Sequence, residues 1–263
     1  MLKINHCCFN IKEYSKACWI IEEECNLNCP YCFQHSFGND IFLHNESAEQ
    51  VISKLQKKEI KYVVLTGGEP LLCKNLFQII AQLQEARIDI GICTNAILAD
   101  EEFCANLSKT LVRNITVNMS LIDIDGNDDK SNRSIQGINN LINKKFKVTL
   151  NDVLLDKWDY TSIQKRVEWA KNIGVKQYSL TVPVCKYPEY PECYIDPDKI
   201  IGITEILKKM DKKMDNSKKM GTFEVVFNIP DCMQDGCPSE EKIFGISDSG
   251  EIEMCLIKKY QRK

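Results

Sequence analysis

The sequence lacks any long apolar run: no stretch of about 18 consecutive apolar residues occurs, and no basic segment followed by an apolar one opens the chain. The first absence excludes a membrane-spanning helix, and the second excludes a secretory signal peptide. Both absences lead us to expect a cytoplasmic protein that does not bind a membrane.

An excess of basic charge is missing as well. The chain has 34 Lys and Arg residues against 37 Asp and Glu residues, a net charge of −3, so no nucleic-acid partner is expected. Tracts rich in proline, glycine or serine are also absent, which excludes a low-complexity linker. With 263 residues, 44% of them hydrophobic, the chain can bury a substantial core in one large domain or in one domain with an appendix.

Histidine is scarce, whereas cysteine is abundant. His6, His35 and His44 form no HxxxH or HxxEH pattern, so we favour structural or surface roles for all three. In a reducing compartment, the 14 cysteines are expected to be metal ligands, reactive thiols or small core residues rather than disulfides.

Three of the cysteines stand close together in the segment CNLNCPYC, residues 25–32. Cys25, Cys29 and Cys32 can hold a metal cluster from one short loop, but they leave it one ligand short. A cubic 4Fe-4S cluster has four irons, so three thiolates leave one iron open for a small molecule, whereas structural zinc requires a closed set of four ligands. The pattern therefore predicts an iron–sulfur cluster with one open iron.

A second motif, TGGEP at residues 66–70, follows a buried-strand pattern at residues 62–65 and begins 34 residues after Cys32. In this order and spacing, the two motifs resemble the signature of the radical S-adenosylmethionine (SAM) enzymes. The resemblance implies a 4Fe-4S cluster on the three cysteines, with SAM bound at the open iron. It also implies that one electron, from a reductant such as flavodoxin or ferredoxin, cleaves SAM, and that the resulting 5'-deoxyadenosyl radical abstracts hydrogen from a substrate.

The same resemblance assigns individual residues to SAM. Gly67, Gly68 and Glu69 are expected to meet the ammonium group of SAM, and Tyr31 is expected to lie against its adenine. Further contacts are expected where the predicted strands end, because chemistry collects at the carboxyl ends of the strands in such barrels. The strand-end candidates are Asn95, Ser120, Arg133 and Asn151.

Strand and helix patterns alternate regularly between residues 18 and 182. The predicted strands are 18–21, 61–65, 88–93, 115–119, 147–152 and 177–182, and the predicted helices are 47–57, 75–84, 100–107, 134–143 and 161–172. This alternation predicts parallel strands joined by right-handed crossovers in an α/β fold, with too few strands for an eightfold barrel. The resemblance implies a partial (β/α)6 barrel over residues 17–182, and residues 1–16 are expected to form an edge strand or an N-terminal extension.

Residues 183–263 are predicted to form a small C-terminal extension. A proline-rich connection at 183–197 leads to an amphipathic helix at 198–214 and a hairpin-like tail. The predicted strands of this tail are 223–228, 242–247 and 251–256, with a turn at 247–250 between the last two.

The extension carries its own cysteine pattern. Cys237, Gly250 and Cys255 read C-x12-G-x4-C, which resembles the opening of the SPASM and twitch extensions that bind auxiliary 4Fe-4S clusters. Because the sequence ends eight residues after Cys255, we expect a truncated extension. Cys232, Cys237 and Cys255 are the candidate ligands of an auxiliary cluster, and the alternative is a remnant hairpin with reduced thiols or zinc.

Cys185 and Cys193 follow the last predicted barrel strand, where a substrate could pass over the barrel mouth. We consider each of them a candidate hydrogen donor to a substrate radical. The remaining cysteines on helix or strand patterns are predicted to be small core residues: Cys73, Cys93 and Cys104.

The substrate is inferred from finer resemblance. Residues 117–137, the asparagine at 151 and the C-terminal cysteine pattern most resemble enzymes that modify ribosomally synthesised peptides by crosslinking or epimerisation. About 16 residues precede the first barrel strand, which counts against a crosslinker with an N-terminal peptide-recognition domain. The alternatives are a radical SAM dehydrogenase or epimerase of a small molecule, such as a sugar or aminocyclitol, and a non-catalytic Fe-S electron carrier, against which the GGE segment argues.

Overall fold

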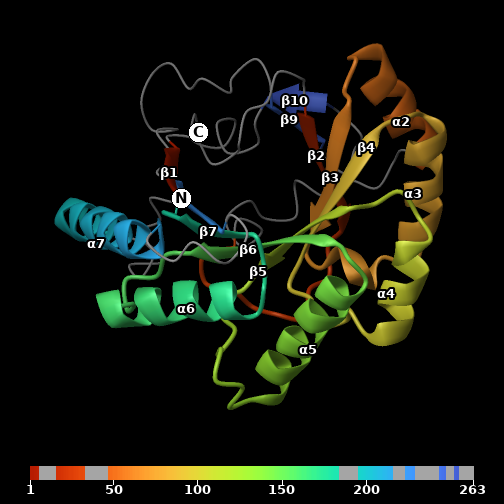
Figure 1. Ribbon diagram of the computed structural model, residues 1–263. Coiled ribbons are helices and arrows are strands. Elements are labelled where there is room, and N and C mark those ends of the chain that lie inside the picture. The colour runs from red at the N-terminus through yellow and green to blue at the C-terminus, as the bar shows by residue number, and fades with distance from the viewer. Residues whose placement is uncertain are drawn as a thin grey trace.

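In the computed structural model, the described residues are 1–5, 16–32, 47–183, 195–215, 223–228, 243–246 and 252–254. Their strands form one ten-stranded sheet in the order β1-β8-β7-β6-β5-β4-β3-β2-β9-β10 (Figure 1). The strands are β1 (Leu2–Asn5), β2 (Lys16–Glu22), β3 (Tyr62–Gly67), β4 (Asp89–Thr94), β5 (Asn114–Asn118), β6 (Lys147–Val153), β7 (Gln177–Thr181), β8 (Glu224–Asn228), β9 (Ile243–Ile246) and β10 (Ile252–Met254).

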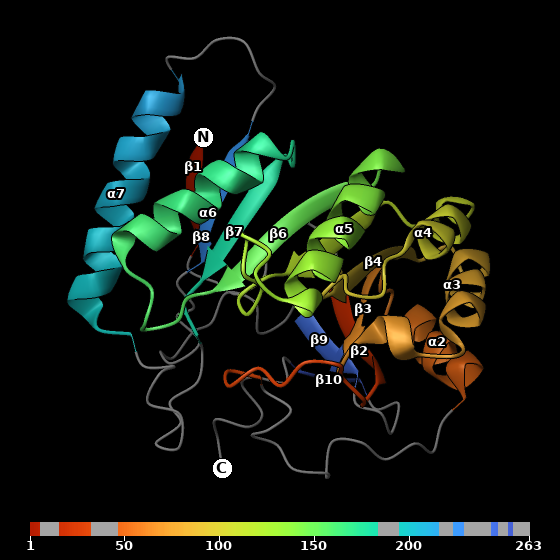
Figure 2. The same cartoon turned by 90° about the horizontal axis from the view of Figure 1, so that it is seen from below.

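The helices lie along the outer side of this curved sheet (Figures 1 and 2). They are α2 (Ala48–Lys57), α3 (Leu76–Glu85), α4 (Glu101–Ser108), α5 (Asp129–Asn143), α6 (Tyr160–Asn172) and α7 (Pro197–Asp215), with a short 3-10 helix, η2 (Pro70–Leu72). Strands β2 to β7 pair in parallel and alternate with α2 to α6. The predicted α/β partial barrel is therefore confirmed.

Alternation along the strands separates the core from the inner face of the barrel. On β5, Ile115 and Val117 are buried in the hydrophobic core, whereas Asn114, Thr116 and Asn118 are only partly buried. Successive side chains of a strand point to opposite faces, so the three polar residues face the concave side of the sheet. The barrel interior thus has a polar wall at this strand.

Side-chain caps set the starts of several helices. Ser47 and Gln50 form the predicted capping box of α2, in which each side chain accepts from the other residue's backbone N–H. Helix α5 begins at residue 129, five residues before the predicted start at 134, because the Asp128 side chain accepts from the Ser131 N–H at 2.8 Å. Arg133 consequently lies inside this helix and not ahead of it.

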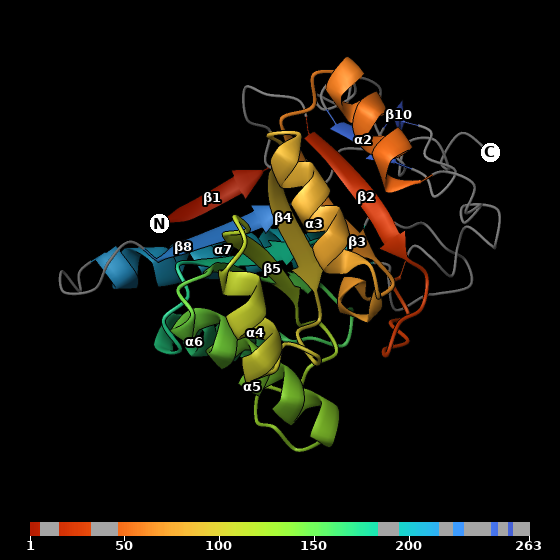
Figure 3. The ribbon, with the colours of Figure 1, turned by 90° about the vertical axis from the view of Figure 1, so that its right-hand side faces the viewer.

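Strand β8 departs from the prediction of a hairpin-like tail that begins at residue 223. It pairs in parallel with β7 on one side and with β1 on the other, and it extends the barrel sheet. Val225, Val226 and Phe227 are all at most 5% exposed, which is the pattern of a strand covered on both faces. Strand β1 stands at the end of the sheet, so residues 2–5 form an edge strand (Figure 3).

The predicted hairpin of the last two strands is confirmed. Strands β9 and β10 pair antiparallel, and β9 also pairs in parallel with β2. One sheet therefore contains strands from both sides of residue 182. Within the described part of the chain, no helix is long and apolar enough to cross a membrane.

Candidate functional site

A cavity of about 640 Å³ lies at the carboxyl ends of β3 to β6, beside the loop that follows β2. This volume is within the range of about 300 to 1,000 Å³ that is typical of ligand sites. The residues predicted from the sequence that line it are Cys25, Cys29, Tyr31, Cys32, Gly67, Gly68, Glu69 and Asn95. The fold thus brings both sequence motifs and one strand-end candidate to a single cavity.

The two motifs are joined through their backbones. The Gly68 N–H donates to the Glu22 carbonyl at 2.7 Å, and the Glu69 N–H donates to the Glu24 carbonyl at 2.8 Å. Gly67 has a φ of +148°, and a Cβ atom on Gly67 or Gly68 would come under 3.0 Å from carbonyl oxygens of residues 22–24. The glycines therefore allow the end of β3 to lie directly against the segment that leads to the first cysteine.

Glu69 is only 1% exposed, and its carboxylate accepts three hydrogen bonds. The Thr94 hydroxyl donates to it at 2.6 Å, and the backbone N–H groups of Asn95 and Leu71 donate at 2.8 Å and 3.0 Å. Burial raises the pKa of Glu69 above its ordinary value, while these donors favour the ionised form. Glu69 therefore ties the end of β3 to the turn after β4, in addition to facing the cavity.

We expect Glu69→Gln to lower the free energy of unfolding by about 1 to 3 kcal/mol. Glutamine has only one acceptor oxygen, so its NH2 group would face at least one of the three donors and leave that donor without an acceptor. Urea denaturation of the metal-free chain measures this loss. The matched control is Glu102→Gln on the exposed side of α4, for which a change within about 0.5 kcal/mol is expected. Equal stabilities of the two variants would contradict an anchoring role for Glu69.

Asn95 holds the cysteine loop, residues 25–32, from the side of β4. Its Nδ2 donates to the Asn26 Oδ1 at 2.6 Å, and its own carbonyl accepts from the Ser134 hydroxyl at 2.7 Å. Lys130 on α5 donates from Nζ to the Asn26 carbonyl at 3.1 Å. Asn26, next to Cys25, is thus held both by Asn95 and by Lys130 of α5. Asn95 itself also lines the cavity.

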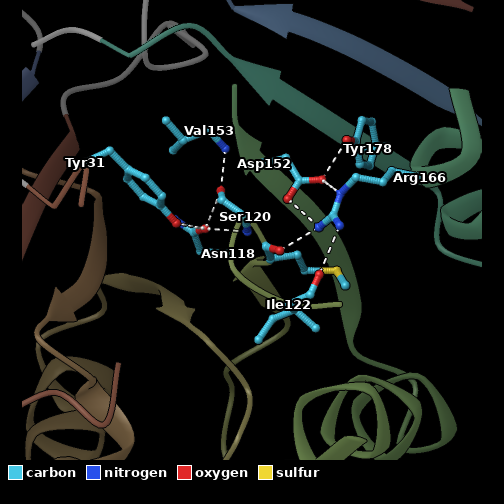
Figure 4. A network of polar contacts seen from close by, with 9 residues as sticks. Tyr31, Asn118, Ser120, Ile122, Asp152, Val153, Arg166 and Tyr178 are labelled. Atoms are coloured by element: carbon cyan, nitrogen blue, oxygen red, sulfur yellow. Dashed lines mark hydrogen bonds and ion pairs between the residues drawn. The ribbon is translucent and has the colours of Figure 1, made fainter. Parts of the chain in front are cut away.

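Asn118 is a cavity residue that sequence reasoning missed. Its Oδ1 accepts from the Tyr31 hydroxyl at 3.1 Å, and from the Ser120 hydroxyl and N–H at 3.0 Å and 3.2 Å (Figure 4). Since a backbone N–H only donates, the Ser120 contact identifies this atom of Asn118 as the oxygen and leaves the NH2 group on the other branch. The alternation of Asn114, Thr116 and Asn118 along one strand was the available signal.

The other strand-end candidates do not line the cavity. Ser120 is 4% exposed and lies behind Asn118, where its hydroxyl also accepts from the Val153 N–H at 2.6 Å. Asn151 is paired with Asn118 in the sheet register, and its Oδ1 accepts from the Thr181 hydroxyl at 3.1 Å. Arg133 is exposed on α5.

The remaining cysteine predictions have different outcomes. Cys104 is fully buried, as expected of a core residue, and Cys73 packs partly buried against the core. Cys93, predicted to be a core residue, instead lines the cavity, and burial raises the pKa of its thiol to about 12. The hydrogen-donor and auxiliary-cluster candidates lie outside the described residues: Cys185, Cys193, Cys232, Cys237 and Cys255.

The donor set at the cavity suits an iron–sulfur cluster. Three thiols open onto it, and the Leu27 N–H donates to the Cys25 Sγ at 3.4 Å. Hydrogen bonds to cluster sulfurs are one of the factors that set the reduction potential of such clusters. Over the ranges that the structure describes, no group of three or more His, Cys, Asp or Glu side chains could hold a single metal ion, so the three thiols share one cavity without being gathered around one point.

The sequence is similar to a family model and to several curated proteins. Residues 19–176 match the radical SAM superfamily. The GTP 3',8-cyclase of Aquifex aeolicus is 28% identical over 210 residues, which cover 73% of this chain and 63% of that protein. The GTP 3',8-cyclase of Staphylococcus haemolyticus is 32% identical over 150 residues, which cover 53% of this chain and 40% of that protein. The chain therefore spans less than two thirds of the length of these relatives.

Among solved structures, SuiB of Streptococcus suis bound to the precursor peptide SuiA superposes with a TM-score of 0.69 at 18% identity, over 93% of this chain and 60% of that one. At this identity the likeness concerns the fold alone. The superfamily match, by contrast, extends over more than half of the chain and includes both motifs. This chain belongs to the radical SAM superfamily, whose enzymes carry a 4Fe-4S cluster and use SAM.

Proposed function

We propose that Cys25, Cys29 and Cys32 hold the 4Fe-4S cluster of this enzyme and that SAM binds in the adjoining cavity. The observation that carries this proposal is the convergence of the three thiols with residues 67–69 on one cavity, joined by the two backbone hydrogen bonds of the glycine segment. In this superfamily the reduced cluster supplies one electron, which cleaves SAM and yields a 5'-deoxyadenosyl radical that abstracts hydrogen from the substrate.

The chain's own residues bind and orient SAM in this proposal. The carboxylate of Glu69 and the backbone of Gly67 and Gly68 meet the ammonium group, which an ionised carboxylate attracts. The Tyr31 hydroxyl is fixed to Asn118, so the ring has one orientation toward the adenine. Such preorganised contacts position the cofactor and exclude competing reactions.

We further propose that the substrate is a ribosomally synthesised peptide, which the enzyme crosslinks or epimerises. Neutral polar side chains support this choice, since a row of them on β5 to β8 lies on the same face of the sheet as Asn118, which lines the cavity. Asn228 donates to Ser179 at 2.7 Å and to Thr181 at 3.1 Å, and Thr181 donates to Asn151. Amides and hydroxyls of this kind match the carbonyl and N–H groups of a peptide backbone. The fold shared with SuiB agrees with this choice.

A nucleotide is the second candidate substrate, because the similar GTP 3',8-cyclases are named for one. A triphosphate is bound best by Arg and Lys, which pair with phosphate oxygens. The neutral row on β5 to β8, at positions 118, 151, 179, 181 and 228, carries amides and hydroxyls instead. The neutral row therefore favours the peptide over GTP.

Deuterium transfer tests the two substrates directly. The anaerobically reconstituted enzyme, with SAM and dithionite, is supplied either with deuterated short peptides encoded beside its gene or with GTP deuterated in the ribose. We expect mass spectrometry to find deuterium in 5'-deoxyadenosine with a peptide and none with GTP. Transfer from GTP would replace the peptide proposal, and failure to form any 5'-deoxyadenosine would contradict the assignment of the cluster and SAM site.

A further inference from the structure

A buried charged cluster lies behind the cavity, on the side of β6 that faces helix α6 (Figure 4). Arg166 of α6 pairs with Asp152 of β6, with Nε to Oδ2 at 2.7 Å and Nη2 to Oδ1 at 2.9 Å. The Tyr178 hydroxyl donates to Asp152 at 2.6 Å, and the Trp158 ring covers the guanidinium at 4.7 Å from its centroid. The paired side chains are only 10% and 1% exposed, so water does not screen their interaction.

Arg166 also holds the turn that follows β5. Its Nη1 donates to the Ile122 carbonyl at 3.0 Å, and its Nη2 donates to the Met119 carbonyl at 2.5 Å. The guanidinium is planar and presents its N–H donors in a rigid fork. One rigid group thus fixes the separation between a carboxylate on β6 and two carbonyls of the turn 119–122.

Stability alone is a weak explanation for this cluster. The free-energy cost of removing two charges from water is only partly offset by their attraction, and apolar replacements of buried ion pairs are often as stable. The Met119 carbonyl also accepts from the Ile122 N–H at 2.8 Å, but the Ile122 carbonyl takes its donor from Arg166, and no apolar side chain supplies one. The cluster therefore specifies one conformation of the turn.

The turn and β6 together carry one wall of the cavity. Ser120 in the turn donates to Asn118 and accepts from Val153 of β6, and both of these partners line the cavity, as does Leu121. We propose that Arg166, which touches no cavity atom in these contacts, is a positioning residue for SAM, because it fixes the turn that holds Asn118 in place. This inference rests on the proposed function, in which SAM occupies the cavity.

Arg166→Lys tests the positioning role. Lysine keeps a positive charge beside Asp152, but its single ammonium nitrogen replaces three donor nitrogens that are spread over the carboxylate and two carbonyls. In the anaerobically reconstituted full chain, we expect the dissociation constant of SAM to rise about tenfold or more, with the iron content unchanged. A loss of this size is typical when a residue that supports a binding site from outside is removed. Equilibrium dialysis and the SAM-induced change in the EPR spectrum of the reduced cluster measure this.

Tyr178→Phe is the matched control. It removes the hydroxyl that donates to Asp152 and leaves both carbonyl contacts of Arg166 intact. We expect this variant to have a lower Tm but a SAM dissociation constant within about twofold of that of the original chain, because the turn 119–122 keeps both of its bonds to Arg166. An unchanged SAM affinity in Arg166→Lys would overturn the proposal, and so would an equal loss of affinity in both variants at equal loss of Tm.

A second variant is needed if Arg166→Lys does not accumulate as folded protein. Trp158→Leu removes the ring that stacks on the Arg166 guanidinium. We expect the SAM dissociation constant to rise at least about threefold, which is more than a substitution at a site not coupled to the cavity would cause. An unchanged constant would again overturn the proposal. If the unmodified chain bound neither iron nor SAM, the proposed function itself would fail, so the two failures are distinguishable.

Discussion

Joint replacement of Cys25, Cys29 and Cys32 by alanine is expected to abolish the formation of 5'-deoxyadenosine from SAM in the presence of dithionite. All three thiols line the cavity beside the GGE segment, and thiolates are the ligands that hold 4Fe-4S clusters. Because loss of an outer partner of a metal ligand typically costs about 10- to 100-fold, loss of the ligands themselves should lower the rate by more than about 1,000-fold. Chromatography of the nucleoside product after anaerobic reconstitution measures the effect.

Cys73→Ala is the control for this triple variant. Cys73 also carries a free thiol and packs partly buried against the core, but it does not line the cavity. We expect its iron content and its rate of SAM cleavage to stay within about twofold of the original. A triple variant that still cleaved SAM at the original rate would refute the assignment of the three ligands.

The same variant addresses the C-terminal cysteines. Cys232, Cys237 and Cys255 stay predictions as ligands of an auxiliary cluster, since they lie outside the described residues. Iron and sulfide that remain in the triple variant would support a second cluster, and complete loss of both would remove it. Iron counting therefore separates the two cluster sites without reference to activity.

The features that the sequence predicted depend on neighbours along the chain. The alternation of strands and helices, the capping box at Ser47 and the strand before Gly67 are each local, and the structure contains all of them, although only Val63 and Leu65 of residues 62–65 are buried. The convergence of the cysteine loop with the GGE segment followed from parallel strands, whose carboxyl ends meet at one edge of the sheet. Local patterns plus one rule of topology therefore reached the cysteine loop, the GGE segment and Asn95, but not the cavity wall on β5 and β6.

The features that were missed depend on contacts between distant segments. Asn118 lines the cavity and accepts from Tyr31, 87 positions away, and the alternation of polar residues along β5 does not signal that contact. Arg166 reads as one more polar residue of an amphipathic helix, yet it is 8% exposed and reaches carbonyls 44 and 47 positions away. Side-chain roles of this kind are set by packing, which the order of residues along the chain does not display.

The place of β8 in the sheet could not be predicted for the same reason. Its strand character was predicted, but its partners are β7 and the N-terminal strand β1, and Leu2 pairs with Val225 across more than 200 residues of sequence. Hairpin patterns report only pairing between adjacent segments. A parallel partner from the other end of the chain leaves no local signal.

Gly68→Ala is expected to damage both the fold and the cofactor site. The added Cβ would come under 3.0 Å from the backbone carbonyls of Glu23 and Glu24, which cannot rotate away as a side chain can. Either the end of β3 or the segment before Cys25 must then move, and the hydrogen bond from the Gly68 N–H to the Glu22 carbonyl is lost or weakened. Overpacking and one lost hydrogen bond together should lower the free energy of unfolding by about 2 to 4 kcal/mol.

Loss of SAM binding distinguishes this variant from a merely destabilised one. Residues 67–69 are hydrogen-bonded to the segment that leads to Cys25, so a shift of one displaces the other. We therefore expect reconstituted Gly68→Ala to bind SAM at least about tenfold more weakly at a temperature where it remains folded. Gly202→Ala on α7 adds the same methyl group, but there it meets only the hydroxyl end of Tyr160, a side chain that is 43% exposed and free to turn. A helical alanine should then stabilise by about 0.5 to 1 kcal/mol and leave SAM affinity unchanged. If Gly68→Ala behaved like this control in denaturation and in SAM binding, the close approach of the two motifs would not be what forms the site.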